Sequence, residues 1–116
     1  MSYLLLILEP RGQREARDVA EGRARYAEMV AFGESLGGKL LASESLRPDS
    51  SGVRVHVQSG KPVLRDGPFA EAKEMIGGFF LLDCASMDEA LAIAQRCPAA
   101  RFASVEVREC APCFVP

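Results

Sequence analysis

The segment from Asp66 to Glu74, Asp-Gly-Pro-Phe-Ala-Glu-Ala-Lys-Glu, carries four ionisable side chains within nine residues. Its first three residues are typical of a turn, because Asp accepts backbone N–H groups, Gly tolerates positive φ and Pro restricts φ. A turn alone does not require the charged residues that follow, or the phenylalanine that precedes them. We therefore interpret the segment as a prepared surface or cleft.

Asp66 is the first catalytic candidate in this segment. Its carboxyl group would act as a general acid or base if partial burial beside Phe69 raised its pKa. The alternative is a turn acceptor that holds the loop. The residues that would orient a polar ligand, or else form a solvated charged loop, are Phe69, Glu71, Lys73 and Glu74. They border the pair Gly77-Gly78, where the backbone can approach a ligand closely.

Glu106 and Arg108 form a second charged pair near the end of the chain. They are two residues apart in an alternating strand, so both side chains point to the same sheet face, opposite Val105 and Val107. If the valines face the helices, the charged pair faces a cavity between two subunits. There it would bind a polar substrate or lock a dimer.

His56 is the other catalytic candidate, because histidine titrates near neutral pH. It lies beside Arg54 and Gln58 on the polar side of an alternating strand. The alternative is an ordinary surface histidine.

The four cysteines do not predict a metal or redox site. Cys84 and Cys97 lie within apolar patterns typical of buried thiols. Cys110 and Cys113 form a C-x-x-C pair, but only three residues follow it, too few for the helix that activates redox pairs. Zinc would need a second pair of ligands. We expect no metal and no cofactor, since no P-loop or dinucleotide fingerprint is present.

Composition and charge narrow the class of protein. The 116 residues fit one domain, and 48% hydrophobic and 26% charged residues are typical of a globular chain. A net charge of −2 argues against nucleic acid as a partner. The apolar run Tyr3–Leu8 is too short to span a bilayer and lacks the flanks of a signal peptide. We expect no membrane association and a cytoplasmic location.

Hydrophobic periodicity predicts six strands and two helices. The expected strands are 3–8, 40–46, 53–58, 61–65, 78–83 and 104–108. The first expected helix covers 14–36, has an apolar face at Val19, Tyr26, Val30 and Gly33, and ends at Gly37-Gly38. The second is capped by Ser86 with Glu89 and has an apolar stripe at Met87, Ala90, Leu91 and Ala94. Ser59-Gly60 is expected to turn a hairpin whose first strand, 53–58, is half-exposed.

With the hairpin set aside as an insertion, the order is β-α-β-β-α-β. This order predicts an α+β, ferredoxin-like fold with an antiparallel sheet and both helices on one face. The expected central strands, 3–8 and 78–83, are apolar on both faces, although the helices can cover only one. A second copy of the sheet is the simplest cover for the other face. We therefore expect a homodimer packed through the open sheet face.

The chain resembles the YCII-related superfamily, in its DGPF-domain branch. The resemblance covers nearly the whole chain and rests on the segment 66–74, then on 77–79, 97–101 and 104–108. It implies a ferredoxin-like fold and a dimeric α/β barrel. Ala72 is a departure, since the family pattern more often has Thr there.

What the resemblance implies about function is limited. Most such proteins have no assigned activity, although the superfamily includes proposed enzymes with a histidine–aspartate pair and a dehydrochlorinase of aromatic degradation. The expected helix 14–36 contains no histidine, so that half of the pair does not carry over. DGPF proteins also often accompany genes for alternative sigma factors.

Two functions are therefore expected. The first is a cofactor-independent enzyme that transfers protons on a small aromatic or carbonyl metabolite, using the ionisable cluster beside an apolar cavity. The second is a non-catalytic ligand-binding or regulatory dimer linked to a sigma factor pathway. The lack of a recognisable nucleophile–base pair favours the second.

Overall fold

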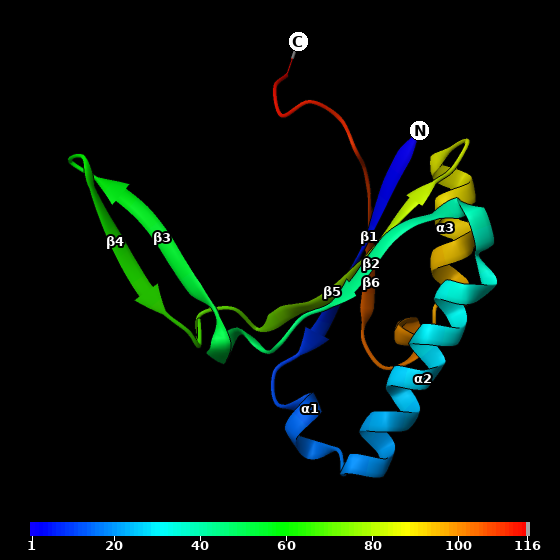
Figure 1. Cartoon of the computed structure of the whole chain (residues 1–116), viewed down its shortest axis with the longest axis horizontal. Coiled ribbons are helices and arrows are strands. Elements are labelled where there is room, and N and C mark those ends of the chain that lie inside the picture. The colour runs from blue at the N-terminus through cyan, green and yellow to red at the C-terminus, as the bar shows by residue number, and fades with distance from the viewer. Residues whose placement is uncertain (116) are drawn as a thin grey trace.

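Four antiparallel strands form the main sheet, in the order β2-β5-β1-β6 (Figure 1). Their bounds are Ser2–Pro10 for β1, Leu40–Ser45 for β2, Glu74–Asp83 for β5 and Ser104–Glu109 for β6. The structure is a computed structural model that describes residues 1–115. The strands expected at the centre, β1 and β5, are the two inner strands. Both are longer than predicted, since β1 continues through Glu9 to Pro10 and β5 begins at Glu74.

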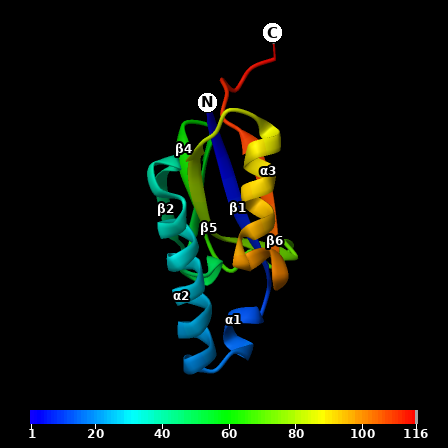
Figure 2. The same ribbon diagram turned by 90° about the vertical axis from the view of Figure 1, so that its right-hand side faces the viewer.

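The helices lie on one face of this sheet, as Figure 2 shows for α2 and α3. Their bounds are Gln13–Ala16 for α1, Val19–Ser35 for α2 and Met87–Arg96 for α3, with short 3-10 turns at 37–39, 49–51 and 98–101. The single helix predicted over 14–36 is wrong. Arg17 has extended backbone, and the Asp18 side chain accepts a hydrogen bond from the Glu21 N–H at 2.8 Å. This cap starts a new helix.

Helix α2 contacts the sheet only with its C-terminal half. Phe32 and Gly33 are its buried residues, and the Phe32 ring meets Phe80 edge-on at a centroid distance of 5.2 Å. Of the predicted apolar face only Gly33 is buried, whereas Val19, Tyr26 and Val30 are exposed. The N-terminal half of the helix projects past the end of the sheet (Figure 2).

The core between helices and sheet follows the alternation of the strands. Tyr3, Leu5 and Ile7 of β1 face the helices and pack with the buried residues of α3. In α3 these are Ala90, Ile93 and Ala94. The prediction that Met87 and Leu91 belong to the buried stripe is wrong, because both side chains are exposed. The free thiols of Cys84 and Cys97 are buried as predicted, and burial raises the pKa of each.

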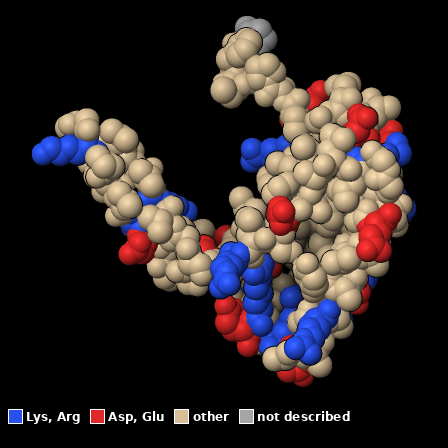
Figure 3. All heavy atoms as spheres, in the orientation of Figure 1, with Lys and Arg blue, Asp and Glu red and all other residues tan. Residues whose placement is uncertain are grey.

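The hairpin forms a separate two-stranded sheet, with β3 at Val53–Gln58 and β4 at Lys61–Asp66. The predicted two-residue turn is confirmed, since Ser59 and Gly60 have φ values of 51° and 76°. The expected half-burial is wrong, because every residue of both strands is exposed. The hairpin stands clear of the body (Figure 3), and the radius of gyration is 16.1 Å. A compact chain of this length has about 13 Å.

Two sequence expectations concern metals and membranes. Cys110 and Cys113 are exposed and free, and residues 1–115 contain no group of three or more side chains suited to holding a metal ion. Over the same residues, no helix combines the length and hydrophobicity that a bilayer crossing requires.

The predicted cap of α3 is present and gives a first test. Ser86 Oγ accepts a hydrogen bond from the Glu89 N–H at 3.2 Å, and Glu89 Oε2 accepts one from the Ala85 N–H. Ser86→Ala should lower the free energy of unfolding by about 0.5–2 kcal/mol in urea denaturation, and Ser86→Asp should retain the stability. Ser50→Ala, on an exposed turn, is the matched control. Equal midpoints for the two alanine variants would argue against the cap.

Candidate functional site

Asp66 lies at the end of β4, exposed, and pairs across the hairpin with Val53. Its carboxylate is exposed, and within residues 1–115 no hydrogen bond to it is present, so the turn-acceptor role is not observed, while the catalytic role stays a prediction. The predicted turn acceptor is replaced by Asp49. Asp49 Oδ2 accepts the Phe69 N–H at 3.1 Å, and Asp49 Oδ1 lies 3.0 Å from Arg11 Nη1. This hydrogen bond from Arg11 lowers the pKa of Asp49.

The requirement for glycine at position 67 comes from packing. Gly67 does not have positive φ, contrary to the turn argument. A Cβ at this position would clash with the backbone oxygen of Asp49 and lie 2.8 Å from its carbonyl carbon. The Gly67 N–H also donates to the Gly52 carbonyl at 2.8 Å, and the Gly67-Pro68 peptide is cis. The motif therefore folds tightly against the turn at 49–51.

Phe69 and Glu71 attach the hairpin to this turn. Phe69 is buried, and the guanidinium carbon of Arg54 lies 3.8 Å from its ring centroid, a cation–π contact. Glu71 pairs with both Arg54, at 2.8 Å, and Arg65. Its own backbone N–H and the Arg65 side chain lower the pKa of Glu71 to about 2. Two of the predicted ligand-binding residues are thus engaged in holding the hairpin. We call this cluster the hairpin junction, comprising Arg11, Asp49, Arg54, Arg65, Phe69 and Glu71.

The other predicted residues do not converge with Asp66. His56 pairs with Val63, and strand alternation puts it on the opposite face of the hairpin from Asp66. Lys73 and Glu74 are exposed beside the start of β5. The two proposed catalytic residues therefore do not form a pair within one subunit.

Glu106 and Arg108 have the predicted orientation. They lie beside Leu6 and Leu4 of β1, on the sheet face away from the helices, while Val105 and Val107 pack against the core. Arg108 Nε lies 2.6 Å from Glu106 Oε2. The pair satisfies its own charges on the open sheet face.

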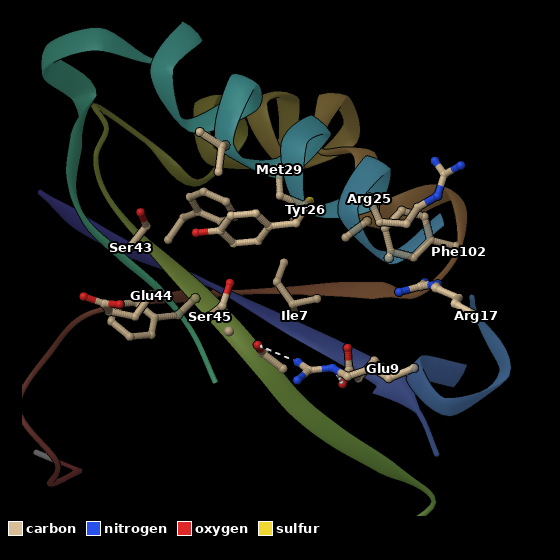
Figure 4. A pocket seen from close by; sticks show the side chains of 18 residues that line it. Ile7, Glu9, Arg17, Arg25, Tyr26, Met29, Ser43, Glu44, Ser45 and Phe102 are labelled. Atoms are coloured by element: carbon tan, nitrogen blue, oxygen red, sulfur yellow. Dashed lines mark hydrogen bonds and ion pairs between the residues drawn. The ribbon is translucent and has the colours of Figure 1, made fainter. Parts of the chain in front are cut away.

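A cavity of about 410 Å³ lies on the other side of the sheet, beneath the N-terminal half of α2 (Figure 4). Its main polar residues are Glu9, Arg14, Arg17, Arg25, Ser43 and Ser45. Its main apolar and aromatic residues are Ile7, Tyr26, Met29, Val30, Phe80 and Phe102. The volume lies within the range of small-molecule sites. We call it the helix-side cavity, and none of the predicted site residues lines it.

Glu9 is the buried carboxylate of this cavity, with only 7% of its surface exposed. It has the same strand phase as Tyr3, Leu5 and Ile7, so the alternation of β1 carries it to the helix side. Gly77 makes room for it, since a Cβ there would lie 2.6 Å from Glu9 Oε2. The alternation of buried and exposed residues along β1 could have identified Glu9 as a buried residue. It was missed because the strand was predicted to stop before Glu9-Pro10.

Arg14 neutralises this carboxylate. Its Nε lies 2.6 Å from Glu9 Oε1, while its Nη atoms donate to the carbonyls of Leu46 and Gly77 at 2.6 and 3.1 Å. The contact with Glu9 joins opposite charges, but the N–H is not aligned for a hydrogen bond, and Glu9 Oε1 is buried without a donor. This oxygen is enclosed by the protein, and its contact is with the charge of Arg14.

Two substitutions test whether Asp49, and not Asp66, stabilises the hairpin junction. Asp49→Asn should lower the urea midpoint, because it removes a charge that pairs with Arg11, whereas Asp66→Asn should leave the midpoint unchanged. Since the pKa of Asp49 is lowered from 3.8 in the folded state, its contribution is complete above that pH and lost as the pH falls. The gap between Asp49→Asn and wild type should therefore narrow in acid. A larger loss for Asp66→Asn would contradict this assignment.

Comparisons with known proteins agree with this fold. An uncharacterised protein of Rhizobium meliloti (strain 1021) is 37% identical over 83 residues, which are 72% of this chain and 60% of that protein's length. A structure of 5-chloro-2-hydroxyhydroquinone dehydrochlorinase from Burkholderia phenoliruptrix AC1100, in complex with 2,5-dihydroxybenzoquinone, is also similar. It has a TM-score of 0.57 and 17% identity, over 96% of this chain and 94% of that one, a likeness of fold. The family model of the YCII-related domain matches residues 1–113, and the chain belongs to the YCII-related family.

Proposed function

We propose that this chain is an enzyme that transfers protons on a small aromatic or carbonyl compound without a cofactor, in the helix-side cavity, with Glu9 as the acid–base group. The observation that carries this proposal is a carboxylate 7% exposed on the wall of a cavity that has both aromatic and polar walls. Burial of an ionisable group beside apolar walls is typical of functional sites. The predicted chemistry is kept, and its location moves from Asp66 and His56 to Glu9.

The residues around Glu9 suit proton transfer next to a carbonyl group. Glu9 would take a proton from a ring O–H, or from a ring carbon that has first been protonated to CH2 beside a carbonyl. In the second case the electron pair of the C–H bond moves through the ring onto the carbonyl oxygen, which becomes an enolate or phenolate. The hydroxyl groups of Ser43 and Ser45 line the same cavity and could donate hydrogen bonds to that oxygen. The proton returns from Glu9 in the reverse step, so atoms and charge balance.

The fold neighbour gives an analogy for the substrate. It acts on a chlorinated hydroxyhydroquinone, and its structure contains a dihydroxybenzoquinone. Both are single planar rings with several oxygen substituents. The aromatic and aliphatic walls of the helix-side cavity, which include Ile7, Phe80 and Phe102, offer flat apolar surface for such a ring. At 17% identity this is support by fold alone.

A second candidate function is a ligand-binding or regulatory protein that uses the same cavity. One observation favours it: Arg14 already pairs with Glu9 at 2.6 Å, as in a site that stabilises a bound ligand without exchanging protons. The resemblance to DGPF proteins near sigma factor genes fits this alternative.

Deuterium exchange separates the two functions. With 2,5-dihydroxybenzoquinone in D₂O, the wild type should exchange the ring hydrogens for deuterium, followed by proton NMR. Glu9→Gln should slow the exchange by about 100-fold or more, because it removes the acid–base group. Glu106→Gln, on the other face of the sheet, is the control. Binding without exchange in the wild type would favour the second function, and exchange at the wild-type rate by Glu9→Gln would refute the role of Glu9.

We also propose that two copies of the chain pack through the open sheet face. Leu4, Leu6 and Phe79 lie on this face, only partly covered. The hairpin adds exposed apolar surface, with Val55 and Val57 each 64% exposed. Since a two-stranded hairpin is marginally stable alone, a partner that contacts it would account for its order. A second copy offers both surfaces at once under two-fold symmetry.

Sedimentation tests the dimer. The wild type should sediment as a dimer at about 10 μM, a concentration well above the Kd of a stable interface. Leu6→Asp should give a monomer or an aggregate, because it introduces a charge into the apolar face. Val19→Asp is the control, since Val19 is 71% exposed on α2. A monodisperse wild-type monomer would end this proposal.

A further inference from the structure

We infer that the helix-side cavity binds its ligand through an oxyanion, recognised by Arg17 and Arg25 above the ring of Phe102. The ligand class is a small planar ring that carries a carboxylate or an acidic enolate or phenolate. This inference rests on the proposed function in placing the ligand in the cavity. It concerns binding alone, so it stands whether or not Glu9 moves a proton.

The side chains around the cavity carry an excess of positive charge. Glu9 and Arg14 cancel one another at 2.6 Å. Glu44 also borders the cavity, but it alternates with Ser43 and Ser45 along β2, so its carboxylate lies on the other face of the sheet (Figure 4). The arginines of α2 and of the segment before it therefore set the charge that a ligand meets.

Arg17 and Arg25 are not fully neutralised. Arg25 Nη1 lies 2.6 Å from Glu28 Oε1, but the other oxygen of Glu28 lies 3.3 Å from Arg101. One carboxylate thus serves two guanidinium groups. Arg17 is half-buried and has no carboxylate within ion-pair distance among residues 1–115. A half-buried cation without a partner attracts an anion more strongly than a fully solvated one does.

Phe102 holds both arginines in place. Their guanidinium carbons lie 4.8 Å and 5.8 Å from its ring centroid, close enough for cation–π contact. The backbone oxygen of Phe102 accepts a hydrogen bond from Gln13 Nε2 at 2.5 Å. In Figure 4 the two arginines and Phe102 gather at one end of the cavity, with Ser43 toward the other. The cations are positioned before a ligand arrives, which lowers the entropy lost on binding.

The same three residues also line a second, more open cavity of about 440 Å³. Gln13, Glu21 and Arg101 also line it, and Gln13 Oε1 is buried without a donor. Arg17, Arg25 and Phe102 therefore border both cavities. A planar guanidinium pairs with carboxylate through two parallel hydrogen bonds, so a flat oxyanion fits this position.

Calorimetric titration with a matched set of rings tests the inference. The probes are 2,5-dihydroxybenzoate as the carboxylate, 2,5-dihydroxybenzoquinone as the enolate, and 2,5-dihydroxybenzamide as the neutral isostere of the first. The wild type should bind the benzoate about tenfold more tightly than the benzamide, since a charge-assisted hydrogen bond replaces a neutral one. Added salt should weaken binding of the anion and leave that of the amide unchanged. The quinone tells whether an enolate is accepted as well as a carboxylate.

Arg17→Gln should remove the preference for the anion, with Arg25→Gln as the second variant if the first fails to fold. Arg23→Gln is the matched control, because Arg23 is exposed on α2 and lines neither cavity. Glu9→Gln removes the charge that cancels Arg14, so it should keep or increase the preference even if it stops proton exchange, and the two proposals fail separately. Equal affinity for benzoate and benzamide, retention of the preference in Arg17→Gln, or no binding of either anion at about 1 mM would overturn the inference.

Discussion

The burial of Glu9 is the constraint on which the site depends. The alternation of β1 carries this carboxylate into the space between sheet and helices, where an unpaired charge would cost several kcal/mol. Arg14 provides the partner, and its further hydrogen bonds to Leu46 and Gly77 fix α1 against the ends of β2 and β5. A side chain at position 77 would press on the Glu9 carboxylate in its present position, since a Cβ there would lie 2.6 Å from Glu9 Oε2. The pair thus connects three strands and α1 through one charged contact.

That contact also explains the shape of the cavity. Because α1 is tied to the sheet by Arg14, the chain must turn at Arg17 and Asp18 before α2 can begin. Helix α2 then reaches the sheet only at Phe32 and beyond, and its first turns remain above an unfilled space. The side chains along that space include Arg17, Arg25 and Tyr26 beside the aliphatic Met29 and Val30. A cavity of this kind arises from the helix break, so filling it with larger apolar residues would compete with the Glu9–Arg14 contact.

The sequence predicted the strands better than the site, for physical reasons that differ by element. Strand β3 and the cap at Ser86 were correct to the residue, because alternation and capping are local. The motif at 66–74 was recognised, but its packing was not predicted, since the partners of Phe69 are Arg11 and Asp49, and no local pattern connects those positions. Glu9 was within reach of the period-two argument. Arg17 was not, because its exposure to a cavity depends on where α2 leaves the sheet.

The two faces of the sheet have different electrostatics, which would separate the proposed dimer contact from the proposed ligand site. On the open face, Glu106 and Arg108 neutralise one another among leucines, a surface that can be desolvated without stranding a charge. On the helix side, Arg17 keeps its charge without a carboxylate among the described residues, a surface better suited to an anionic ligand than to a protein core. The conspicuous motif serves neither face directly and instead fixes the hairpin through Phe69 and Glu71. Because the sheet itself divides these regions, a change to one face should leave the chemistry of the other intact.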